Sequence, residues 1–564
     1  MLPSHKDLCR HFIPLLLAMG APAASAEVAL RGPEAIVALL RPYVPAEATP
    51  TRRLHAMLAE ILATEGYFSA TFEPFFQGGE QGLRVEPGPR TTVAGVDLAI
   101  AGPVAQETVT ALTAEWRLPA GNPFRQRDWS DAKQHVLSTL LANEHAAARL
   151  VDSTAEIDTE THQARLHARV DAGPPFRFGA LRIAGLERYP GALIDRYNRH
   201  IKAGASYHEE HLAALQGVLQ ATPYFSSVRV AIDQENAEAA ADGSRIAPVQ
   251  IDVRERPAHR LGAGAGISSN TGARIELSYH TPDLFRQAWV LDAGLRIEQK
   301  KQTAYADIFL PPDEKNRRHG IGLAVDSTDI EGLRTRREAF GVQTIQQRGS
   351  VEQRLSLHWE QERRKPGNAP ETRNQALVPN AMWTWRNVDD PLDPRQSTVL
   401  QMQVGGGAKA LLSDQNFLRL HGRWQQYFPL GRLDTLALRA ELGATLADSR
   451  QGIPQDYLFR AGGTGSVRGY SYQSLGAAEG SATVGGRYLG VFSMEATHWL
   501  NADWGIAAFV DAGDAADRAS DLKLAVGYGL GVRWRSPAGP IGLDLAQGQR
   551  TGRLHLHFAL AIPF

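Results

Sequence analysis

From Arg260 to the end of the chain, apolar and polar residues alternate with a period of two. The alternation is clearest in segments 291–298, 355–360, 435–442 and 524–534. Successive side chains of a β-strand point to opposite faces, so this pattern predicts strands with one apolar face. A soluble β-sandwich and a membrane β-barrel both show such alternation, so the pattern alone does not separate them.

Three features favour a membrane barrel for residues 258–564. The alternation continues throughout this region, and tyrosines and tryptophans recur near strand ends, as in the aromatic girdles of membrane barrels. The last predicted strand, Arg553–Phe564, carries apolar side chains on one face up to a terminal aromatic residue. At about 19 residues for each strand and turn, the region accommodates about sixteen strands. The sequence therefore predicts an antiparallel transmembrane β-barrel.

The first half of the chain carries a faint internal repeat instead. A short segment from valine to proline recurs at nearly equal spacing, at Val85–Pro89, Val170–Pro174 and Val253–Pro257. Repeats longer than about 50 residues indicate tandem small domains. We place these domains at residues 27–89, 90–174 and 175–257.

Each repeat is predicted to contain its elements in the order strand, helix, helix, strand, strand. This half of the chain is therefore expected to be α+β. In the second repeat, Asp128–Ala142 is expected to form the longer helix, because apolar residues recur there at helical spacing. These residues are Trp129, Ala132, Val136 and Leu140.

Residues 1–26 are predicted to be a secretory signal peptide. The segment has a basic start, an apolar middle and a small-residue end, carried by Lys6 and Arg10, Ile13–Met19 and Ala24–Ala26. Cys9, the only cysteine, is expected to leave with it, which excludes disulfides and thiol chemistry in the mature chain. No later apolar run approaches the roughly 20 residues of a spanning helix. A net charge of −1 gives no basic excess for nucleic acid.

A glycine-dense segment, Ala461–Tyr470, lies between predicted strands and contains one cation, Arg468. We expect it to tuck into the barrel lumen, where a buried arginine needs an acid. Period-two counting places Asp511 and Glu495 on the lumen face of their strands. The alternative is that these are scattered lumen charges, ordinary in any barrel. The loop positions that we single out are Gly462, Gly463, Gly465, Val467, Arg468, Gly469 and Tyr470.

Glycines also mark the wall against which this segment is expected to pack. Gly527, Gly529 and Gly531 occupy every second position of one predicted strand. All three are expected on its lumen face, where they leave room for a loop. Gly465 and Gly469 could then approach the barrel wall closely.

Other apparent motifs do not support catalysis. Gly462–Ser466 lacks the Gly-Lys-Ser/Thr end of a phosphate-binding loop, and neither G-x-S-x-G nor H-E-x-x-H occurs. His555 and His557 share a face but have no third metal ligand in sight. We therefore predict no catalytic residue, no metal site and no cofactor, and the chain is not expected to be an enzyme.

Several motifs resemble those of one protein family. Val467–Tyr470 resembles the VRGF/Y signature of the BamA/TamA superfamily of outer-membrane assembly proteins. Phe509–Gly513 resembles the F-x-D-x-G motif whose aspartate pairs with the loop arginine in that superfamily, and Glu495 matches the glutamate of the neighbouring strand. Arg533–Pro540 resembles a turn of the TamA branch, and Arg553–Phe564 resembles a bacterial outer-membrane β-signal. The repeats resemble POTRA domains, and three of them before one barrel match the TamA layout.

The resemblance implies a bacterial outer-membrane protein with its POTRA domains in the periplasm. It implies a factor that promotes insertion of autotransporters and other unfolded outer-membrane clients into the lipid bilayer. It also implies an inner-membrane-anchored partner similar to TamB. POTRA edge strands would pair with extended segments of client or partner. The alternative is a two-partner-secretion-type exporter that conducts an unfolded polypeptide through the barrel lumen.

Insertion is expected at a lateral seam between the first barrel strand, about Arg260–Ser268, and the last, Arg553–Phe564. The glycines of the first strand weaken its packing and its ladder. A weak seam could open sideways and template a client strand, hiding its unpaired groups from lipid. The predicted seam residues are Gly262, Gly264, Gly266, Phe558, Leu560 and Phe564.

Overall fold

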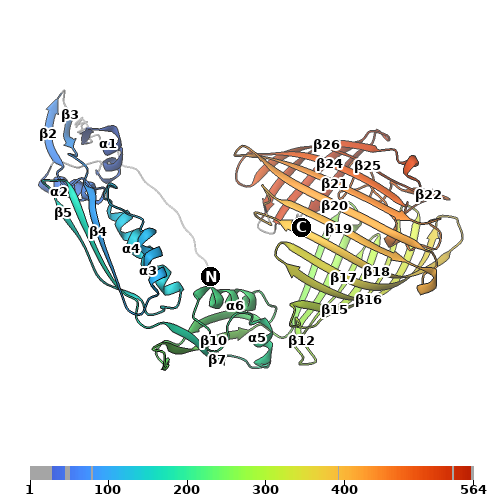
Figure 1. Ribbon diagram of the computed structural model, residues 1–564. Coiled ribbons are helices and arrows are strands. Elements are labelled where there is room, and N and C mark those ends of the chain that lie inside the picture. The colour runs from blue at the N-terminus through green and yellow to red at the C-terminus, as the bar shows by residue number, and fades with distance from the viewer. Residues whose placement is uncertain (1–27, 45–50, 78–79, 392, 537–538, 561–564) are drawn as a thin grey trace, which may run out of the picture. The chain divides into compact units, whose positions relative to one another are not determined.

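The computed structural model describes residues 28–44, 51–77, 80–391, 393–536 and 539–560. The predicted signal peptide, residues 1–26, and the predicted seam residue Phe564 lie outside the described residues. The N-terminal half contains three small α/β sheets, and the rest of the chain forms a sixteen-stranded antiparallel sheet curled into a barrel (Figure 1). None of the helices in the described ranges is long and apolar enough to cross a membrane.

The three N-terminal sheets follow the predicted order of elements. The first unit consists of β1 (Ala29–Arg31), α1 (Glu34–Leu40), α2 (Arg52–Thr64), β2 (Thr71–Gln77) and β3 (Glu80–Glu86). The second consists of β4 (Thr92–Ala101), α3 (Gln106–Ala114), α4 (Gln126–Ala142), β5 (Arg149–Asp158) and β6 (Gln163–Asp171). The third consists of β7 (Phe176–Ala184), α5 (Ala192–Tyr197), α6 (Glu209–Gln220), β8 (Phe225–Ile232), the short β9 (Glu238–Ala239) and β10 (Arg245–Glu255). The last strand of each unit lies in the middle of its sheet, in the orders β1-β3-β2, β4-β6-β5 and β7-β10-β8.

The helix that was expected from apolar spacing buries its apolar face. Helix α4 begins at Gln126 rather than Asp128. Its four residues at helical spacing are all buried, and they are Trp129, Ala132, Val136 and Leu140. In the first unit, Leu58 and Leu62 of α2 pack in one cluster with Leu83 of β3. The helical period predicted here is thus the period of the buried face.

A carboxylate fastens the end of β10 to the turn before α5. Glu255 accepts hydrogen bonds from the backbone N–H groups of Glu187 and Arg188, both at 2.9 Å, and of Tyr189 at 3.3 Å. Arg188 Nε also donates to it, at 2.7 Å. Burial raises the pKa of the Glu255 carboxyl, but these donors outweigh burial and hold the pKa below its ordinary value.

We expect Glu255→Gln to destabilise the third unit by about 1–2 kcal/mol, because neutral hydrogen bonds replace charge-assisted ones. Since the folded-state pKa is depressed, this stabilisation is present above the unfolded-state pKa of about 4.3 and is lost as the pH falls through the folded-state value. Amide hydrogen exchange of residues 187–189 at pH 7 measures the effect. Equal exchange rates in parent and variant would contradict it.

The barrel sheet follows the chain order, except that β24 pairs directly with β21. The first eight strands are β11 (Arg260–Ser268), β12 (Gly272–Leu284), β13 (Trp289–Glu298), β14 (Lys301–Phe309), β15 (Arg317–Ile330), β16 (Leu333–Arg348), β17 (Val351–Pro366) and β18 (Thr372–Asn387). The other eight are β19 (Thr398–Gly407), β20 (Phe417–Leu430), β21 (Asp434–Leu446), β24 (Tyr488–Trp499), β25 (Trp504–Ala516), β26 (Ala525–Ser536), β27 (Gly539–Gly548) and β28 (Leu554–Leu560). The predicted number of about sixteen strands is confirmed.

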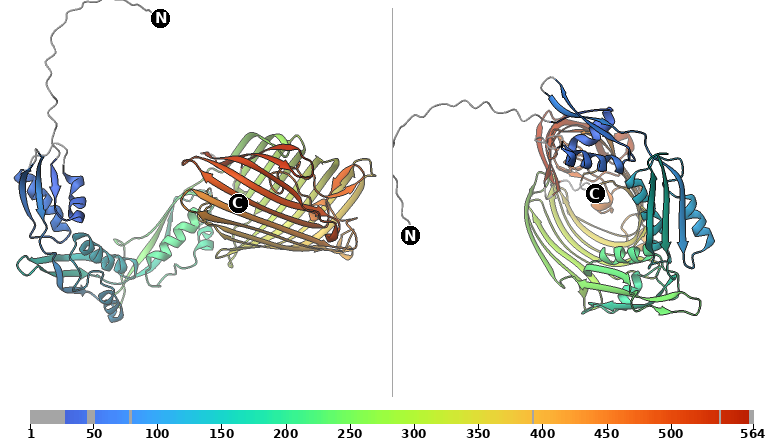
Figure 2. Two further views of the ribbon diagram at one scale, coloured as in Figure 1. Left: turned by 90° about the horizontal axis from the view of Figure 1, so that it is seen from above. Right: turned by 90° about the vertical axis from the view of Figure 1, so that its left-hand side faces the viewer.

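The two faces of the barrel wall differ as the alternation predicts. On β25, Ile506 is 50% exposed on the outer face, whereas Phe509 is 6% exposed on the lumen face. Large apolar residues cover the outer face, and Leu530 is one of the most exposed. Figure 2 shows the strands tilted around the ring, in side view on the left and from one end on the right.

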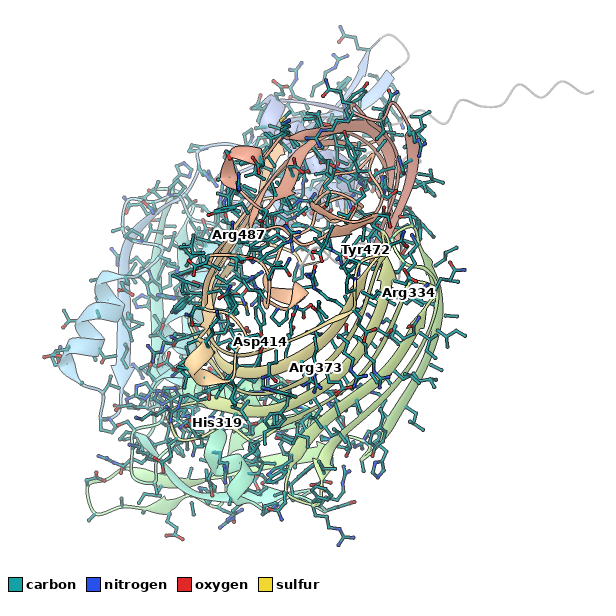
Figure 3. All side chains as sticks on the ribbon, turned by 90° about the vertical axis from the view of Figure 1, so that its right-hand side faces the viewer. His319, Arg334, Arg373, Asp414, Tyr472 and Arg487 are labelled. Atoms are coloured by element: carbon teal, nitrogen blue, oxygen red, sulfur yellow. The ribbon has the colours of Figure 1, made fainter. Side chains whose placement is uncertain are left out.

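The connection between β21 and β24 folds into the lumen. It contains a short hairpin of β22 (Ala477–Glu479) and β23 (Ala482–Val484). Val484 packs with Leu333 of β16, and Glu479 accepts two hydrogen bonds from Arg364 of β17, at 3.0 and 3.2 Å. The view along the barrel in Figure 3 shows side chains gathered inside the ring, with Tyr472 of this connection labelled. The lumen segment is therefore held to the wall at more than one place.

Candidate functional site in the barrel lumen

Three glycines let residues 461–470 turn back on themselves. Gly462, Gly463 and Gly469 have φ angles of 105°, 95° and 87°, which other residues rarely adopt. The N–H of Gly462 donates to Ser466 Oγ at 2.8 Å, and that of Gly463 donates to the Val467 carbonyl at 3.1 Å. Val467 is fully buried. This turn carries Arg468 to the barrel wall.

Arg468 is 5% exposed and forms a two-pronged ion pair with Asp511 of β25. Its Nε lies 2.7 Å from Oδ2 and its Nη2 lies 3.0 Å from Oδ1. The backbone N–H of Arg468 donates to the same carboxylate at 3.0 Å, and the Ser493 hydroxyl donates to it at 2.6 Å. The guanidinium also lies over the Phe509 ring, 3.4 Å from its centroid. Charge and a cation–π contact together hold this side chain in one position.

Two further acids and a second arginine extend the network. Arg468 Nη1 donates to Glu495 of β24 at 2.6 Å and to Asp544 of β27 at 3.0 Å. Arg533 of β26 binds the same two acids, with Nε 2.9 Å from Glu495 and Nη1 2.6 Å from Asp544. Each charge therefore has a partner, as burial requires. The network ties the loop to four consecutive strands.

Sequence reasoning placed Asp511 and Glu495 in the lumen but did not identify Asp544 and Arg533 as members of this network. Asp544 could have been found by the same counting, because it stands between the outward-facing Leu543 and Leu545. Its role as a partner of Arg468 depends on β27 passing beside the loop. No local signal in the sequence indicates that proximity.

The loop approaches the wall at Gly527 and Gly469. A Cβ on Gly527 would overlap the carbonyl oxygen of Arg468, and a Cβ on Gly469 would lie 2.6 Å from the backbone nitrogen of Gly548. Next to Gly469, Tyr470 is buried; its hydroxyl donates to the Val526 carbonyl at 3.1 Å. Glycine is required at these two positions, because the backbone of the loop and the backbone of the wall come too close for a Cβ atom.

The expectation was wrong for three other glycines. Gly465 has no neighbouring atom within 4 Å of a built Cβ, so it does not lie against the wall. Gly529 makes room for the Leu545 carbonyl oxygen and the Phe509 ring rather than for the loop, and Gly531 makes room for Asp544. Space on the lumen face is therefore shared between the loop and side chains of the wall itself.

The barrel sheet has two ends, β11 and β28, and within the described residues no ladder joins them. In the part of the chain that the structure describes, the hydrogen bonds between the two sides pass through one hydroxyl. Ser269 Oγ, next to the end of β11, accepts from the Phe558 N–H at 3.1 Å and donates to the Phe558 carbonyl at 3.4 Å. Among the described residues, this seam is the least hydrogen-bonded junction of the sheet.

The other predicted seam residues pair inward from the two edges. Gly262, Gly264 and Gly266 pair with residues of β12, and Leu560 pairs with Ile541 of β27. Their ladders therefore stabilise the edges of the seam but do not close it. Phe564 lies outside the described residues, as noted above.

The fold and the site define a class of membrane barrel protein, with small α/β domains before a sixteen-stranded barrel whose loop is fixed inside by an arginine. Residues 257–562 match the Omp85 superfamily domain, which covers more than half of the chain. The chain belongs to the Omp85 superfamily.

The chain is similar to known proteins over different lengths. An outer membrane protein assembly factor BamA from Nitratidesulfovibrio vulgaris is 27% identical over 199 residues, which are 33% of this chain and 25% of that relative. The crystal structure of BamA from Haemophilus ducreyi lacking POTRA domains 1–3 is 14% identical, with a TM-score of 0.69, and covers 83% of this chain and 98% of that one. CdiB from Acinetobacter baumannii is 11% identical with a TM-score of 0.45, and covers 90% and 96% of the two chains. The match to the curated relative thus spans about a quarter of that protein's length.

Proposed function

We propose that this chain is an outer-membrane insertion factor of the TamA type. It accepts unfolded autotransporter and other β-barrel clients at the seam between β11 and β28 and passes them into the lipid bilayer. The single observation that carries the proposal is that, within the described residues, no β-ladder joins β11 to β28. Within the described residues, the hydroxyl of Ser269, next to the end of β11, provides the hydrogen bonds across the seam.

Unpaired groups at a strand edge are ready to pair with another chain. In hydrocarbon they are also costly, since lipid offers them no hydrogen-bond partner. An incoming client strand that pairs with β11 or β28 satisfies its own backbone groups and those of the edge together. The folding of the client then drives insertion, and no nucleotide is needed.

The N-terminal sheets support a receiving role. Each has strand edges, such as β2 in the first and β5 in the second, that can pair with an extended segment without reading its sequence. We assign these sheets to the periplasm, as POTRA domains that receive clients and an inner-membrane-anchored partner similar to TamB. Three such sheets before the barrel are compatible with the TamA layout.

An exporter would need a free path through the lumen. The connection between β21 and β24 lies in this lumen, and its Arg468 is bound to three acids of the wall. Its hairpin is bound to Arg364 on another part of the ring. These contacts favour insertion at the seam over conduction through the lumen.

The test is to lock the seam with a disulfide. Ser269→Cys with Phe558→Cys uses the two residues that meet across the seam, where the Ser269 hydroxyl contacts the Phe558 backbone. A Cα separation of about 4.4–6.8 Å is required for the bond. In liposomes, the oxidised protein should lose insertion of a urea-unfolded eight-stranded barrel client, and reduction should restore it.

The matched control is Ala263→Cys with Leu277→Cys, which links neighbouring residues of the existing β11–β12 ladder. This link leaves the seam free and should leave client insertion unchanged. Full insertion by the oxidised seam variant, with the disulfide verified by mass spectrometry, would overturn the proposed function.

A further inference from the structure

The lumen loop contacts both sides of the seam as well as the wall behind it. On one side it reaches Asn270, in the turn that follows β11. On the other it reaches His557, which lies on β28. The loop therefore forms a second, indirect connection between two strands that share little direct bonding.

The contact with Asn270 uses both polar atoms of its side chain. Nδ2 donates to Thr464 Oγ1 at 2.8 Å, and Oδ1 accepts from the Thr464 N–H at 3.3 Å. Gly463 adjoins this contact, since a Cβ there would lie 2.9 Å from Asn270 Oδ1. Among the described residues, the hydrogen bonds from residues 461–470 to the β11 side all end on Asn270.

The contact with His557 is a single hydrogen bond at a buried site. Nε2 of this histidine accepts from the Gly469 N–H at 2.9 Å, so its proton is on Nδ1. His557 is 4% exposed, and within the described residues its buried Nδ1 has no hydrogen-bond partner. An unsatisfied buried donor offsets part of the gain from the bond at Nε2.

The rest of the loop belongs to the β28 side. Arg468 is fixed to acids of β24, β25 and β27, and the Tyr470 hydroxyl accepts from the backbone N–H of Arg550 at 3.1 Å. Release at Asn270 would therefore free β11 while the loop stays with the last strands. Of the two contacts, the one with Asn270 is therefore the one whose loss separates β11 from the loop.

We propose that the loop braces the seam, with Asn270 and His557 as the positioning residues that hold β11 and β28 to it. The seam opens by release of the Asn270–Thr464 contact, and β11 is the edge that moves. This inference deepens the proposed function and rests on it, because client insertion is the reason for the seam to open. It concerns the equilibrium between the closed and the open seam, which can be measured without any client.

The experiment measures the distance across the seam in lipid bilayers. Spin labels are placed at Ile267→Cys on β11 and Leu556→Cys on β28, which are 68% and 62% exposed on the outer face. Cys9 is replaced by serine, so that these are the only thiols. Pulsed electron paramagnetic resonance then gives the populations of short and long distances.

Asn270→Ala should raise the ratio of long to short distances about fivefold, the change produced by loss of one net hydrogen bond. His557→Phe should raise it by a similar factor, and His557→Gln, whose side chain can still accept from Gly469, should restore the parent ratio. Glu479→Gln is the matched control, because it weakens the loop at Arg364, away from the seam. It should leave the ratio unchanged.

A parent-like ratio in Asn270→Ala, with the barrel folded on unheated gels, would overturn the brace even where His557→Phe does not fold. An equal rise in Glu479→Gln would overturn it as well, because any loosening of the loop would then suffice. The proposed function fails separately. If locking the seam leaves client insertion intact while Asn270→Ala still shifts the distances, the brace stands and the insertion role does not.

Discussion

Replacing Arg468 with alanine is expected to destabilise the barrel by about 3–5 kcal/mol, the usual loss when one partner of a buried ion pair is removed. Asp511 is fully buried and would lose both of its guanidinium hydrogen bonds. Glu495 and Asp544 would share Arg533 alone. Uncompensated negative charge in the lumen is the physical reason for the large effect.

The measurement is the urea concentration at which the folded band on unheated gels disappears. The matched control is Arg334→Ala, at the residue labelled in Figure 3, whose ion pair with Asp329 spans 2.8 Å between side chains that are 72% and 56% exposed. Such a pair contributes about 0–1 kcal/mol. Arg468→Lys should fall between the two, because an ammonium cannot make the two-pronged contact. A loss in Arg468→Ala no larger than in Arg334→Ala would reject the structural role of the network.

Gly527→Val is expected to destabilise the folded barrel by about 3 kcal/mol or more, at the upper end of overpacking losses. The first added carbon would overlap the carbonyl oxygen of Arg468, and that backbone is held in place by Asp511. The loop cannot move away without breaking the ion pairs of Arg468, and β26 is held by its ladders with β25 and β27. We expect the loop to leave its site, or the barrel to fold poorly.

Gly465→Ala is the matched control, since its added Cβ would meet no atom within 4 Å. It should fold and resist urea like the parent. Protease cleavage within residues 461–470, measured in detergent, distinguishes a displaced loop from a misfolded barrel. A Gly527→Val protein with parent stability and a protected loop would show that the close approach is not required.

The barrel wall could be predicted from the sequence because strand facing is a local property. Alternation alone places Asp511 inward and Ile506 outward on β25, whatever the rest of the chain does. The same holds for the buried face of α4, where helical spacing selects Val136 and Leu140. The loop motif also predicts an arginine that needs acids, because buried charge is costly in any fold.

The sequence by itself determined the strands, their inward and outward faces, the α+β repeats and the need of Arg468 for a carboxylate. Only the tertiary structure decided that Asp544 shares that arginine, that Gly527 of the wall lies against the loop, and that Gly465 of the loop lies away from the wall. It alone decided that Asn270 and His557 meet the same loop across the seam. The physical reason is that these contacts join residues far apart in the chain. They depend on strand register and on how the sheet curls, and neither is encoded in the alternation of neighbouring residues.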